Sequence, residues 1–468
     1  MSMLIGGRWR EASRYYDVRD PYGGDVIARA PLSDDGDLDA ALSAAVRAKS
    51  VMAAMPGYQR ADLLRRAGTL IDERSAALAN LMVQETGKTI RDARAEVTRS
   101  RETLLLAAEE AVRIEGEHVP LDASAQGAGK LCFLMRFPVG VIAAVTPFNA
   151  PLNLACHKIG PALAAGNAVV LKAPPQAPGV IWELSRIFAD AGAPEGSLNV
   201  LYGDRIGPSL VKDHRVDFIS FTGSTRAGAQ IKAASGLKRV ALELGGTGTT
   251  IVHSDAEVEK AAILCARNAM RLAGQSCISV QTVMVHRAIL DDFLEAMLAE
   301  VARLRLGDPS DEATDVGPVI DESSAVRIES WVAEAVRSGA RVLSGGTRAA
   351  AMIEPTVLIN VESDMRVVSE EVFGPVASVM TYDALDEAYE TISGSRYGLQ
   401  TGIFTRSLET ALQAVRCLRT GGVIINGTST WRTDQMPYGG IKNSGMGREG
   451  PKFAIRDMTE ERLVLFNI

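Results

Sequence analysis

The chain has 468 residues, 47% of them apolar and 23% charged, and its 57 acidic and 50 basic side chains give a net charge of −7. This length exceeds one domain of about 150 residues, and the composition is that of ordinary folded proteins, which excludes a single small module and a disordered chain. The acidic balance argues against a nucleic-acid partner, which a basic surface would bind. No apolar run reaches the roughly 18 residues of a membrane span and no signal-peptide core is present, so we expect a cytoplasmic protein with no membrane partner.

The first third of the chain has the periodicity of amphipathic helices. Apolar residues recur every three or four positions from Leu38 to Met52, and a second stripe begins at Leu63. From residue 139 onward, short apolar strands alternate with helical stretches. We expect these strands at residues 139–145, 168–171, 198–201, 216–221 and 240–242. Strands without polar alternation that are separated by helices indicate a parallel sheet covered on both faces.

A second α/β portion is expected from about residue 245 to residue 445. Its clearest elements are a helix at 255–272 and strands at 280–285 and 422–425. The chain ends in a bare strand sequence, Leu463-Val-Leu-Phe466. Because an exposed strand edge is prone to association, we expect this strand to add to a sheet in a partner subunit.

Residues 216–229 contain a candidate phosphate-binding turn. A buried strand ends in Thr222-Gly223-Ser224, and a helix starts at once, with Gly228 inside its first turns. Free backbone N–H groups at a helix N-terminus, together with the Ser224 hydroxyl, suit a phosphate. The spacing is G-x4-G instead of G-x-G-x-x-G, so this stretch alone fits an ordinary strand-to-helix turn equally well.

Glu243 follows Gly223 by 20 residues and precedes the paired glycines Gly245 and Gly246. In dinucleotide-binding folds an acid at that distance contacts the adenosine ribose. A carboxylate beside glycines, which let a ligand approach the backbone closely, also suits a general base. The local sequence leaves both interpretations open.

Five cysteines, an odd number without CxxC spacing, predict reduced thiols. Cys277 lies in a glycine-containing connection, Gly274-Gln-Ser-Cys277, where a thiol is exposed and can be activated as a nucleophile. The other four are expected to be packing residues: Cys132, Cys156, Cys265 and Cys417. His157 follows Cys156 directly, but neighbouring helical residues do not share a face, so the two cannot act as a nucleophile and its base. No His or Cys spacing suits a metal site.

Many short motifs occur in one order along the chain. They are Glu85-Thr-Gly-Lys88, Thr146-Pro-Phe-Asn-Ala-Pro151, Pro161-Ala-Leu-Ala-Ala-Gly-Asn167, Val170-Leu-Lys172, Phe221-Thr-Gly-Ser224, Leu242-Glu-Leu-Gly-Gly246, Gly274-Gln-Ser-Cys277, Glu354-Pro-Thr356, Glu370-Glu-Val-Phe-Gly-Pro375 and Pro437-Tyr-Gly-Gly-Ile-Lys-Asn-Ser-Gly445. In this order they resemble the aldehyde dehydrogenase superfamily over nearly the whole chain.

The resemblance implies an α/β fold with two doubly wound parallel-sheet domains and a small β oligomerisation domain. Residues 1–118 and 138–244 match the dinucleotide-binding domain, and residues 245–445 match the catalytic domain. Residues 119–137 and 446–468 match the oligomerisation segments, so a homodimer or homotetramer is expected.

The resemblance also implies roles for the candidate residues. Cys277 matches the family nucleophile, Asn149 the oxyanion-hole residue and Glu243 the general base, which favours the base over the ribose-binding interpretation. A small aldehyde would then be oxidised to its carboxylate through a Cys277 hemithioacetal and thioester, with hydride passing to NAD or NADP and Glu243 activating the hydrolytic water. The positions that match cofactor contacts are Lys172, Phe221, Gly223, Ser224, Glu371 and Phe373.

Two positions depart from the family pattern. Pro175 stands three residues after Lys172, where many NAD-specific members carry a ribose-binding Glu. A carboxylate there would repel a 2′-phosphate, so its loss permits NADP as well as NAD. Thr282 stands where relatives commonly have Arg, and we attach no function to this change.

Arg99, His157 and Arg432 match positions that line the substrate tunnel in the superfamily. This trio resembles the branch that acts on small polar or anionic aldehydes, which includes lactaldehyde, phosphonoacetaldehyde, sulfoacetaldehyde and non-phosphorylating glyceraldehyde-3-phosphate enzymes. Guanidinium groups suit the oxygens of phosphonate, sulfonate or carboxylate. Ser276 argues against an anion, because some phosphonate- and phosphate-specific relatives carry Arg before the nucleophile.

Two alternatives to a hydrolytic dehydrogenase share the family motifs. A CoA-acylating dehydrogenase releases acyl-CoA, and such relatives typically lack the Glu that matches Glu243. A non-catalytic family member would have lost Cys277, Asn149 or Glu243, and the chain retains all three. The sequence therefore favours the hydrolytic enzyme.

Overall fold

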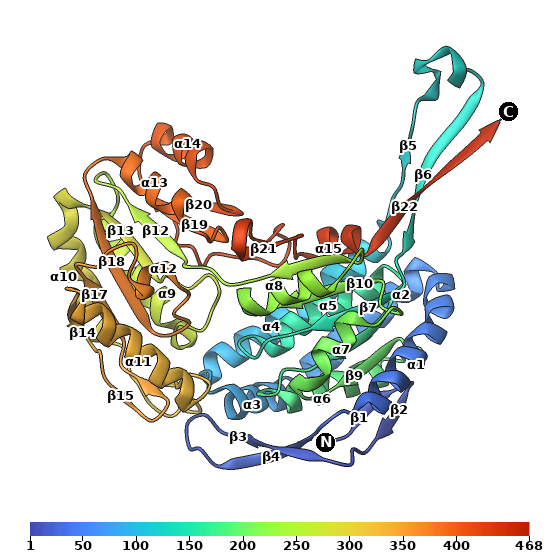
Figure 1. Ribbon diagram of the computed structural model, residues 1–468, viewed down its shortest axis with the longest axis horizontal. Helices are drawn as coiled ribbons and strands as arrows, with labels where there is room; N and C mark the ends of the chain where they lie inside the picture. The colour runs from blue at the N-terminus through green and yellow to red at the C-terminus, as the bar shows by residue number, and fades with distance from the viewer. Residues whose placement is uncertain (468) are drawn as a thin grey trace.

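The computed structural model describes residues 1–467, which form two α/β units and a β arm that projects from the first unit (Figure 1). The first unit is built on five parallel strands and one short antiparallel strand. They are β7 (Val141–Val145), β8 (Ala168–Lys172), β9 (Leu198–Leu201), β10 (Phe218–Thr222), β11 (Arg239–Glu243) and the antiparallel β21 (Gly445–Met446), in the order β21-β11-β10-β7-β8-β9. The parallel strands lie within two residues of the predicted positions, so the predicted parallel sheet is confirmed.

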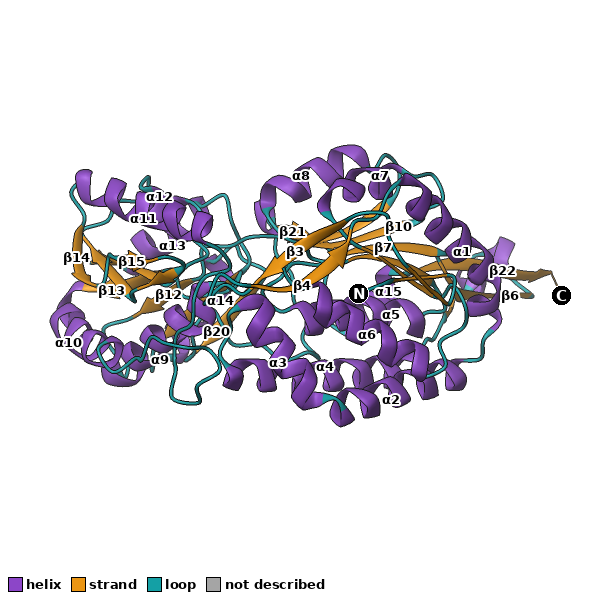
Figure 2. Cartoon of the chain, turned by 90° about the horizontal axis from the view of Figure 1, so that it is seen from below, coloured by secondary structure: helices purple, strands orange, loops and turns teal. Residues whose placement is uncertain are grey.

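Helices cover both faces of this sheet (Figure 2). One face carries α1 (Asp35–Ala54), α7 (Gly207–Lys212) and α8 (Thr225–Ala234), and the other carries α5 (Pro151–Ala164) and α6 (Pro178–Asp190). Outside α5 and α6 pack α2 (Gly57–Glu73), α3 (Ser75–Thr86) and α4 (Ile90–Ala111). Because β7, β8 and β9 are covered on both sides, all their residues are buried, as the unbroken apolar runs predict.

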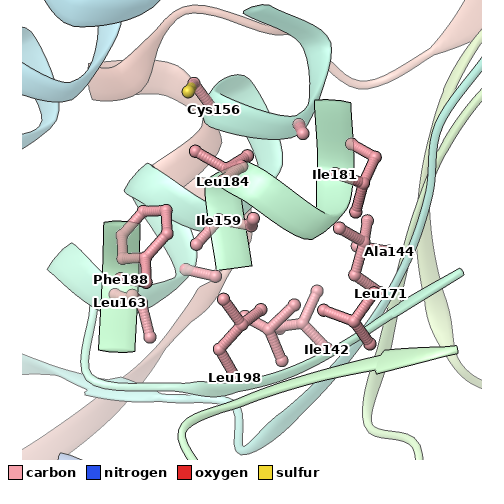
Figure 3. Close-up of a cluster of buried hydrophobic side chains, with 14 of the residues drawn as sticks. Ile142, Ala144, Cys156, Ile159, Leu163, Leu171, Ile181, Leu184, Phe188 and Leu198 are labelled. Atoms are coloured by element: carbon pink, nitrogen blue, oxygen red, sulfur yellow. The ribbon is translucent and has the colours of Figure 1, made fainter. Parts of the chain in front are cut away.

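Part of the core of the first unit lies between the sheet and the helices α5 and α6 (Figure 3). Ile142 and Leu171 of the sheet face Ile159 of α5 and Leu184 and Phe188 of α6, and each of these side chains is at most 1% exposed. This packing fixes the carboxyl ends of the strands, where the candidate cofactor residues lie.

The second unit contains a seven-stranded sheet. Its strands are β12 (Thr249–Val252), β13 (Thr282–His286), β14 (Arg341–Ser344), β17 (Thr356–Ile359), β18 (Val376–Tyr382), β19 (Gln400–Phe404) and β20 (Gly422–Ile425), in the order β14-β17-β18-β13-β12-β19-β20. All neighbours are parallel except β14 and β17. The helices of this unit are α9 (Val258–Met270), α10 (Leu290–Val301), α11 (Glu322–Arg337), α12 (Arg366–Ser369), α13 (Leu385–Gly394) and α14 (Leu408–Cys417).

The arm consists of β5 (Glu117–His118), β6 (Lys130–Pro138) and β22 (Thr459–Asn467). The terminal strand β22 pairs with β6 of its own chain over its whole length, and its other edge has no partner strand among residues 1–467. Residues 446–468 are predicted as one oligomerisation segment, whereas α15 (Pro451–Asp457) packs on α5 and α4 and places Ile455 in the first core. Within residues 446–467, only β22 therefore extends into the arm (Figure 1).

Three short hairpins lie outside the two large sheets and the arm. They are β1 (Met3–Ile5) with β2 (Arg8–Arg10), β3 (Tyr15–Arg19) with β4 (Val26–Pro31), and β15 (Arg348–Ala349) with β16 (Met352–Ile353). The first two precede the helices of the first third, and the sequence does not predict them. No helix within residues 1–467 combines the length and apolar character that a membrane crossing requires.

Candidate active site

Cys277 lies in the connection between α9 and β13, which the backbone folds sharply. Leu272 and Ala273 have φ values of 56° and 51°, and Gly274 follows at 70°. A Cβ on Gly274 would lie 1.9 Å from the carbonyl oxygen of Gly374, so only glycine fits there. Cys277 is a partly exposed residue in this turn.

The other cysteines divide into two kinds. Cys132, Cys156 and Cys265 are buried, and burial raises the pKa of Cys156 and Cys265. Cys417, which is predicted as a packing residue, is instead exposed, because it ends α14 on the solvent side of the helix.

Asn149 lies in the turn between β7 and α5, beside the loop of Cys277. Its Nδ2 donates a hydrogen bond to the carbonyl oxygen of Gln275 at 3.0 Å, and its buried Oδ1 has no partner among residues 1–467. Its backbone carbonyl accepts from Lys88 Nζ at 2.9 Å. The side-chain amide is thereby held beside the loop that carries Cys277.

Glu243 ends β11 and is 5% exposed, with no hydrogen-bond partner for either carboxyl oxygen among the described residues. It lies against Gly439, where an added Cβ would come within 2.7 Å of Oε1. Burial raises the pKa of Glu243 well above its usual value; the negative charge of Glu449 adds to this, and Arg432 and Lys158 oppose it. A carboxyl group in such surroundings is a candidate acid–base group.

Tyr438 contacts the candidate nucleophile directly. Its hydroxyl oxygen lies 3.0 Å from Cys277 Sγ, and the guanidinium carbon of Arg432 lies 3.8 Å from the centre of its ring. Burial raises the pKa of Cys277 to about 12, and the hydrogen bond to Tyr438 opposes that rise. Sequence reasoning missed Tyr438, although it belongs to the motif that begins at Pro437.

The three predicted substrate residues are brought together around Asp434. Arg99 of α4 donates to Asp434 Oδ1 at 2.7 Å and to Oδ2 at 3.3 Å, and His157 Nε2 of α5 lies 2.9 Å from Oδ1. Arg432 Nη2 lies 3.2 Å from the same His157 nitrogen. Burial acts to raise the pKa of Asp434, but the hydrogen bonds from His157 and Arg99 outweigh it and hold this pKa below its usual value.

Glu449 joins this cluster to the carboxyl end of the first sheet. It accepts from Arg432 Nη2 at 3.0 Å, from Lys158 Nζ at 3.4 Å and from the Thr222 hydroxyl at 3.2 Å. Burial opposes its ionisation, but the charges of Lys158 and Arg432 prevail and lower its pKa to about 2. The buried Nε of Arg432 has no partner among residues 1–467, so one donor of this guanidinium is left unsatisfied.

The predicted adenosine contacts line a cavity of about 720 Å³ between α7 and α8. Phe221 and Ile231 give it an apolar lining, and Lys172 lies in its wall. Lys172 Nζ donates to Asp204 Oδ1 at 2.5 Å, a partner that sequence reasoning missed. Pro175 contributes only its backbone carbonyl, which accepts from the Tyr16 hydroxyl at 3.1 Å. An apolar slot with charged groups in its wall suits a flat ring joined to a ribose.

The predicted phosphate contacts lie where β10 ends and α8 begins. Gly223 N–H donates to the Glu243 carbonyl at 3.0 Å, and the Ser224 hydroxyl accepts from Ala227 N–H at 3.3 Å as the N-cap of α8. The other N–H groups of the first turn of α8 have no partner within the helix, as at any helix start. Such groups suit a pyrophosphate.

The predicted nicotinamide-side contacts come from the second unit. The Gly246 N–H donates to Glu371 Oε1 at 3.4 Å, and burial raises the pKa of Glu371 to about 7. Phe373 has a φ of 51° and packs edge-on to Phe148, with ring centres 5.9 Å apart. Arg327 of α11 adds a positive charge near Glu371, and sequence reasoning missed it. Both units thus contribute residues suited to one dinucleotide.

No group of three or more His, Cys, Asp or Glu side chains within residues 1–467 is arranged to hold a metal ion.

Comparison with known proteins defines the class of this enzyme. The family model for the aldehyde dehydrogenase family matches residues 9–464. The chain is 42% identical over 468 residues to a 3-sulfolactaldehyde dehydrogenase of Priestia aryabhattai, covering 100% of this chain and 98% of that protein.

Solved structures give the same result. Aldehyde dehydrogenase 21 from Physcomitrella patens, in complex with the reaction product succinate, matches with a TM-score of 0.97 and 38% identity over 100% of this chain and 98% of that one. The glyceraldehyde-3-phosphate dehydrogenase GapN of Methanocaldococcus jannaschii, complexed with NADP, matches with a TM-score of 0.94 and 36% identity over 97% of this chain and 100% of that one.

The chain therefore belongs to the aldehyde dehydrogenase family, and the fold predicted from its motifs is confirmed. It is an oxidoreductase that uses NAD or NADP, since its solved relatives include NADP complexes and an NAD-dependent enzyme.

Proposed function

We propose that this enzyme oxidises a small anionic aldehyde to its carboxylate, with Cys277 as the nucleophile. The observation that carries this proposal is the cluster of Arg99, His157 and Arg432 around Asp434, which reaches the thiol through Tyr438. Two relatives support it: one is named for a sulfonate-bearing aldehyde, and the other binds the dicarboxylate succinate as its product.

The residues divide the chemistry between addition and hydrolysis. Cys277 Sγ adds as its thiolate to the carbonyl carbon, and the resulting oxyanion accepts from Asn149 Nδ2 and from the Cys277 backbone N–H. When bound, the nicotinamide supplies the hydride acceptor for the oxidation. Glu243 then removes a proton from the water that adds to the Cys277 thioester, and because burial raises the pKa of Glu243, its carboxylate form is a stronger base for this step.

Cofactor choice follows from two neighbouring positions. Pro175 carries no carboxylate that would repel a 2′-phosphate near Lys172. The ammonium of Lys172 is already paired with the carboxylate of Asp204. Asp204 is 73% exposed in its side chain, so a 2′-phosphate can displace it at little cost. We propose that both NAD and NADP are accepted.

A panel of short aldehydes tests the proposed function. Each is offered with NAD or NADP, and formation of NADH or NADPH is followed at 340 nm. Aldehydes with a sulfonate, phosphonate or carboxylate group are expected to give a higher kcat/KM than neutral aldehydes of the same length. Cys277→Ser is expected to retain no more than a few per cent of turnover, and Cys417→Ser, which changes an exposed thiol, is the matched control. Substantial turnover in Cys277→Ser, or a rate that depends on added CoA, would contradict the proposal.

A further inference from the structure

Tyr438 makes the one side-chain hydrogen bond to Cys277 Sγ within residues 1–467, at 3.0 Å. We propose that Tyr438 is a catalytic residue whose hydroxyl donates a hydrogen bond to the Cys277 thiolate, both when the sulfur attacks and when it leaves. The inference rests on the proposed role of Cys277 and deepens it, because it names what stabilises the reactive form of that thiol.

The direction of this hydrogen bond follows from the chemistry of its two atoms. A neutral thiol can donate or accept, but a thiolate has no proton and only accepts. The Tyr438 hydroxyl must therefore donate once Cys277 is ionised. Hydrogen bonds to a charged acceptor are stronger than neutral ones, so the contact stabilises the thiolate more than the thiol. It opposes the burial that otherwise disfavours the ionised sulfur.

The surrounding structure holds the hydroxyl in place. Tyr438 is 4% exposed, and its backbone N–H and carbonyl both pair with Glu449, at 3.2 and 2.6 Å. The guanidinium of Arg432 lies over its ring, with 3.8 Å from Cζ to the ring centre, and Arg432 is itself paired with Glu449. A positive charge at that position draws electron density away from the phenol oxygen, which makes the O–H group a better donor. Ring, donor and cation thus form one fixed unit behind the sulfur.

The same hydroxyl serves the second half of the reaction. Hydrolysis of the thioester breaks the C–S bond, and the electron pair of that bond goes to Sγ. The sulfur then again carries a negative charge 3.0 Å from the Tyr438 oxygen. The phenol keeps its proton throughout, so the step consumes no further reactant.

Tyr438→Phe tests the inference, because it removes the hydroxyl and keeps the ring under Arg432. The reaction of Cys277 with iodoacetamide is measured between about pH 6 and 11 in the full enzyme. Mass spectrometry follows the peptide that contains Cys277, since the exposed Cys417 also reacts. We expect alkylation of Cys277 to be about ten-fold slower at each pH of this range, which lies below the pKa of the thiol, and this corresponds to a rise of that pKa by about one unit. The kcat is expected to fall more than KM rises, since the contact acts on the sulfur and not on substrate binding.

Tyr389→Phe is the matched control, because it removes a buried tyrosine hydroxyl that has no partner among the described residues. Its profile is expected to coincide with that of the unaltered enzyme. An alkylation rate in Tyr438→Phe that equals the rate of the unaltered enzyme at each pH overturns the inference and leaves Cys277 as the nucleophile. If instead alkylation of Cys277 in the unaltered enzyme leaves turnover intact, the proposed function fails, and the inference fails with it.

Discussion

Asp434 is a buried carboxylate that orients two of the proposed substrate-binding side chains. It is 4% exposed and satisfies its oxygens with Arg99 and His157. The Arg99 side chain is 39% exposed, so its guanidinium is held at the edge of the cluster with donors to spare. His157 is fully desolvated, and burial lowers its pKa, which favours the neutral ring as a donor to Asp434.

Asp434→Asn is expected to weaken the binding of anionic aldehydes selectively. The amide keeps the shape of the carboxylate but no longer fixes both oxygens against Arg99 and His157, so the guanidinium loses its orientation. We expect KM for an anionic aldehyde to rise about ten-fold, which corresponds to about 1.4 kcal/mol, with a much smaller change for a neutral aldehyde of equal length. Steady-state kinetics on the two aldehydes measure this.

Asp383→Asn provides the control for that variant. Asp383 also pairs with an arginine, Arg287, at 2.8 Å, but on an exposed surface of the second unit. Its loss is expected to leave both KM values unchanged, because exposed pairs contribute little. An equal rise of KM for the anionic and the neutral aldehyde in Asp434→Asn would mean that Asp434 only supports the fold.

At the scale of elements, α4 anchors the start of α5, the helix that carries His157 and Lys158. Glu96 of α4 accepts the N–H groups of Leu152 and Asn153 at 2.9 and 3.1 Å, as a side-chain cap supplied by another helix. Its second oxygen pairs with the buried Lys88, whose ammonium also donates to the Asn149 carbonyl. The Glu96 carboxylate thus fixes the start of α5 and, through Lys88, the turn that carries Asn149, the proposed oxyanion-hole residue.

Glu96→Gln is expected to lower both stability and turnover. The amide keeps an acceptor for the α5 N–H groups but leaves the ammonium of Lys88 buried without its counter-charge, which costs about 3 kcal/mol. The melting temperature measures the loss of stability, and kcat reports the displaced Asn149. The double variant Glu96→Gln, Lys88→Met removes the unpaired charge and is expected to recover part of the melting temperature. Additive losses in the double variant would contradict the pairing.

The elements that sequence predicts best are those whose burial is uniform. The strands β7, β8 and β9 are mainly apolar and fully buried because helices cover both faces of the sheet. The hairpin β3–β4 escapes prediction because its mixture of exposed and buried residues in 5- and 6-residue strands has no clear period. The helix α15 is predicted in one segment with the terminal strand, and only its contacts with α4 and α5 show that it packs on the first unit.

The residues of the candidate site also differ in how well the sequence predicts them. Motif resemblance is enough to single out Cys277, Glu243 and Asn149, because each belongs to a short contiguous sequence. Tyr438 and Asp434 acquire their roles only through contacts with residues more than 100 positions away in the chain, such as the 161 that separate Tyr438 from Cys277. Such pairings are products of the tertiary fold, and no local pattern encodes them.

At the scale of the whole molecule, the arm formed by β5, β6 and β22 stands apart from both cores (Figure 1). Its apolar side chains are exposed: Leu463 is 60%, Phe466 51% and Leu465 43% accessible. Leu463 and Leu465 lie on one face of β22 and Phe466 on the other, so the arm presents apolar side chains on both faces. An apolar strand with a free edge is prone to association, and we propose that a second subunit covers this arm in a homodimer or homotetramer.

Replacing the exposed leucines of the arm is therefore expected to dissociate the enzyme. The double variant Leu463→Lys, Leu465→Lys places two charges on one face of β22, where burial against a partner would then require their desolvation. Light scattering after size-exclusion chromatography is expected to show an oligomer for the unaltered chain and a monomer for the variant. The matched control Leu408→Lys, Leu412→Lys alters two exposed leucines of α14, far from the arm, and is expected to stay oligomeric. A monomeric unaltered enzyme would contradict the proposed assembly, and an oligomeric arm variant would show that the interface lies on another surface.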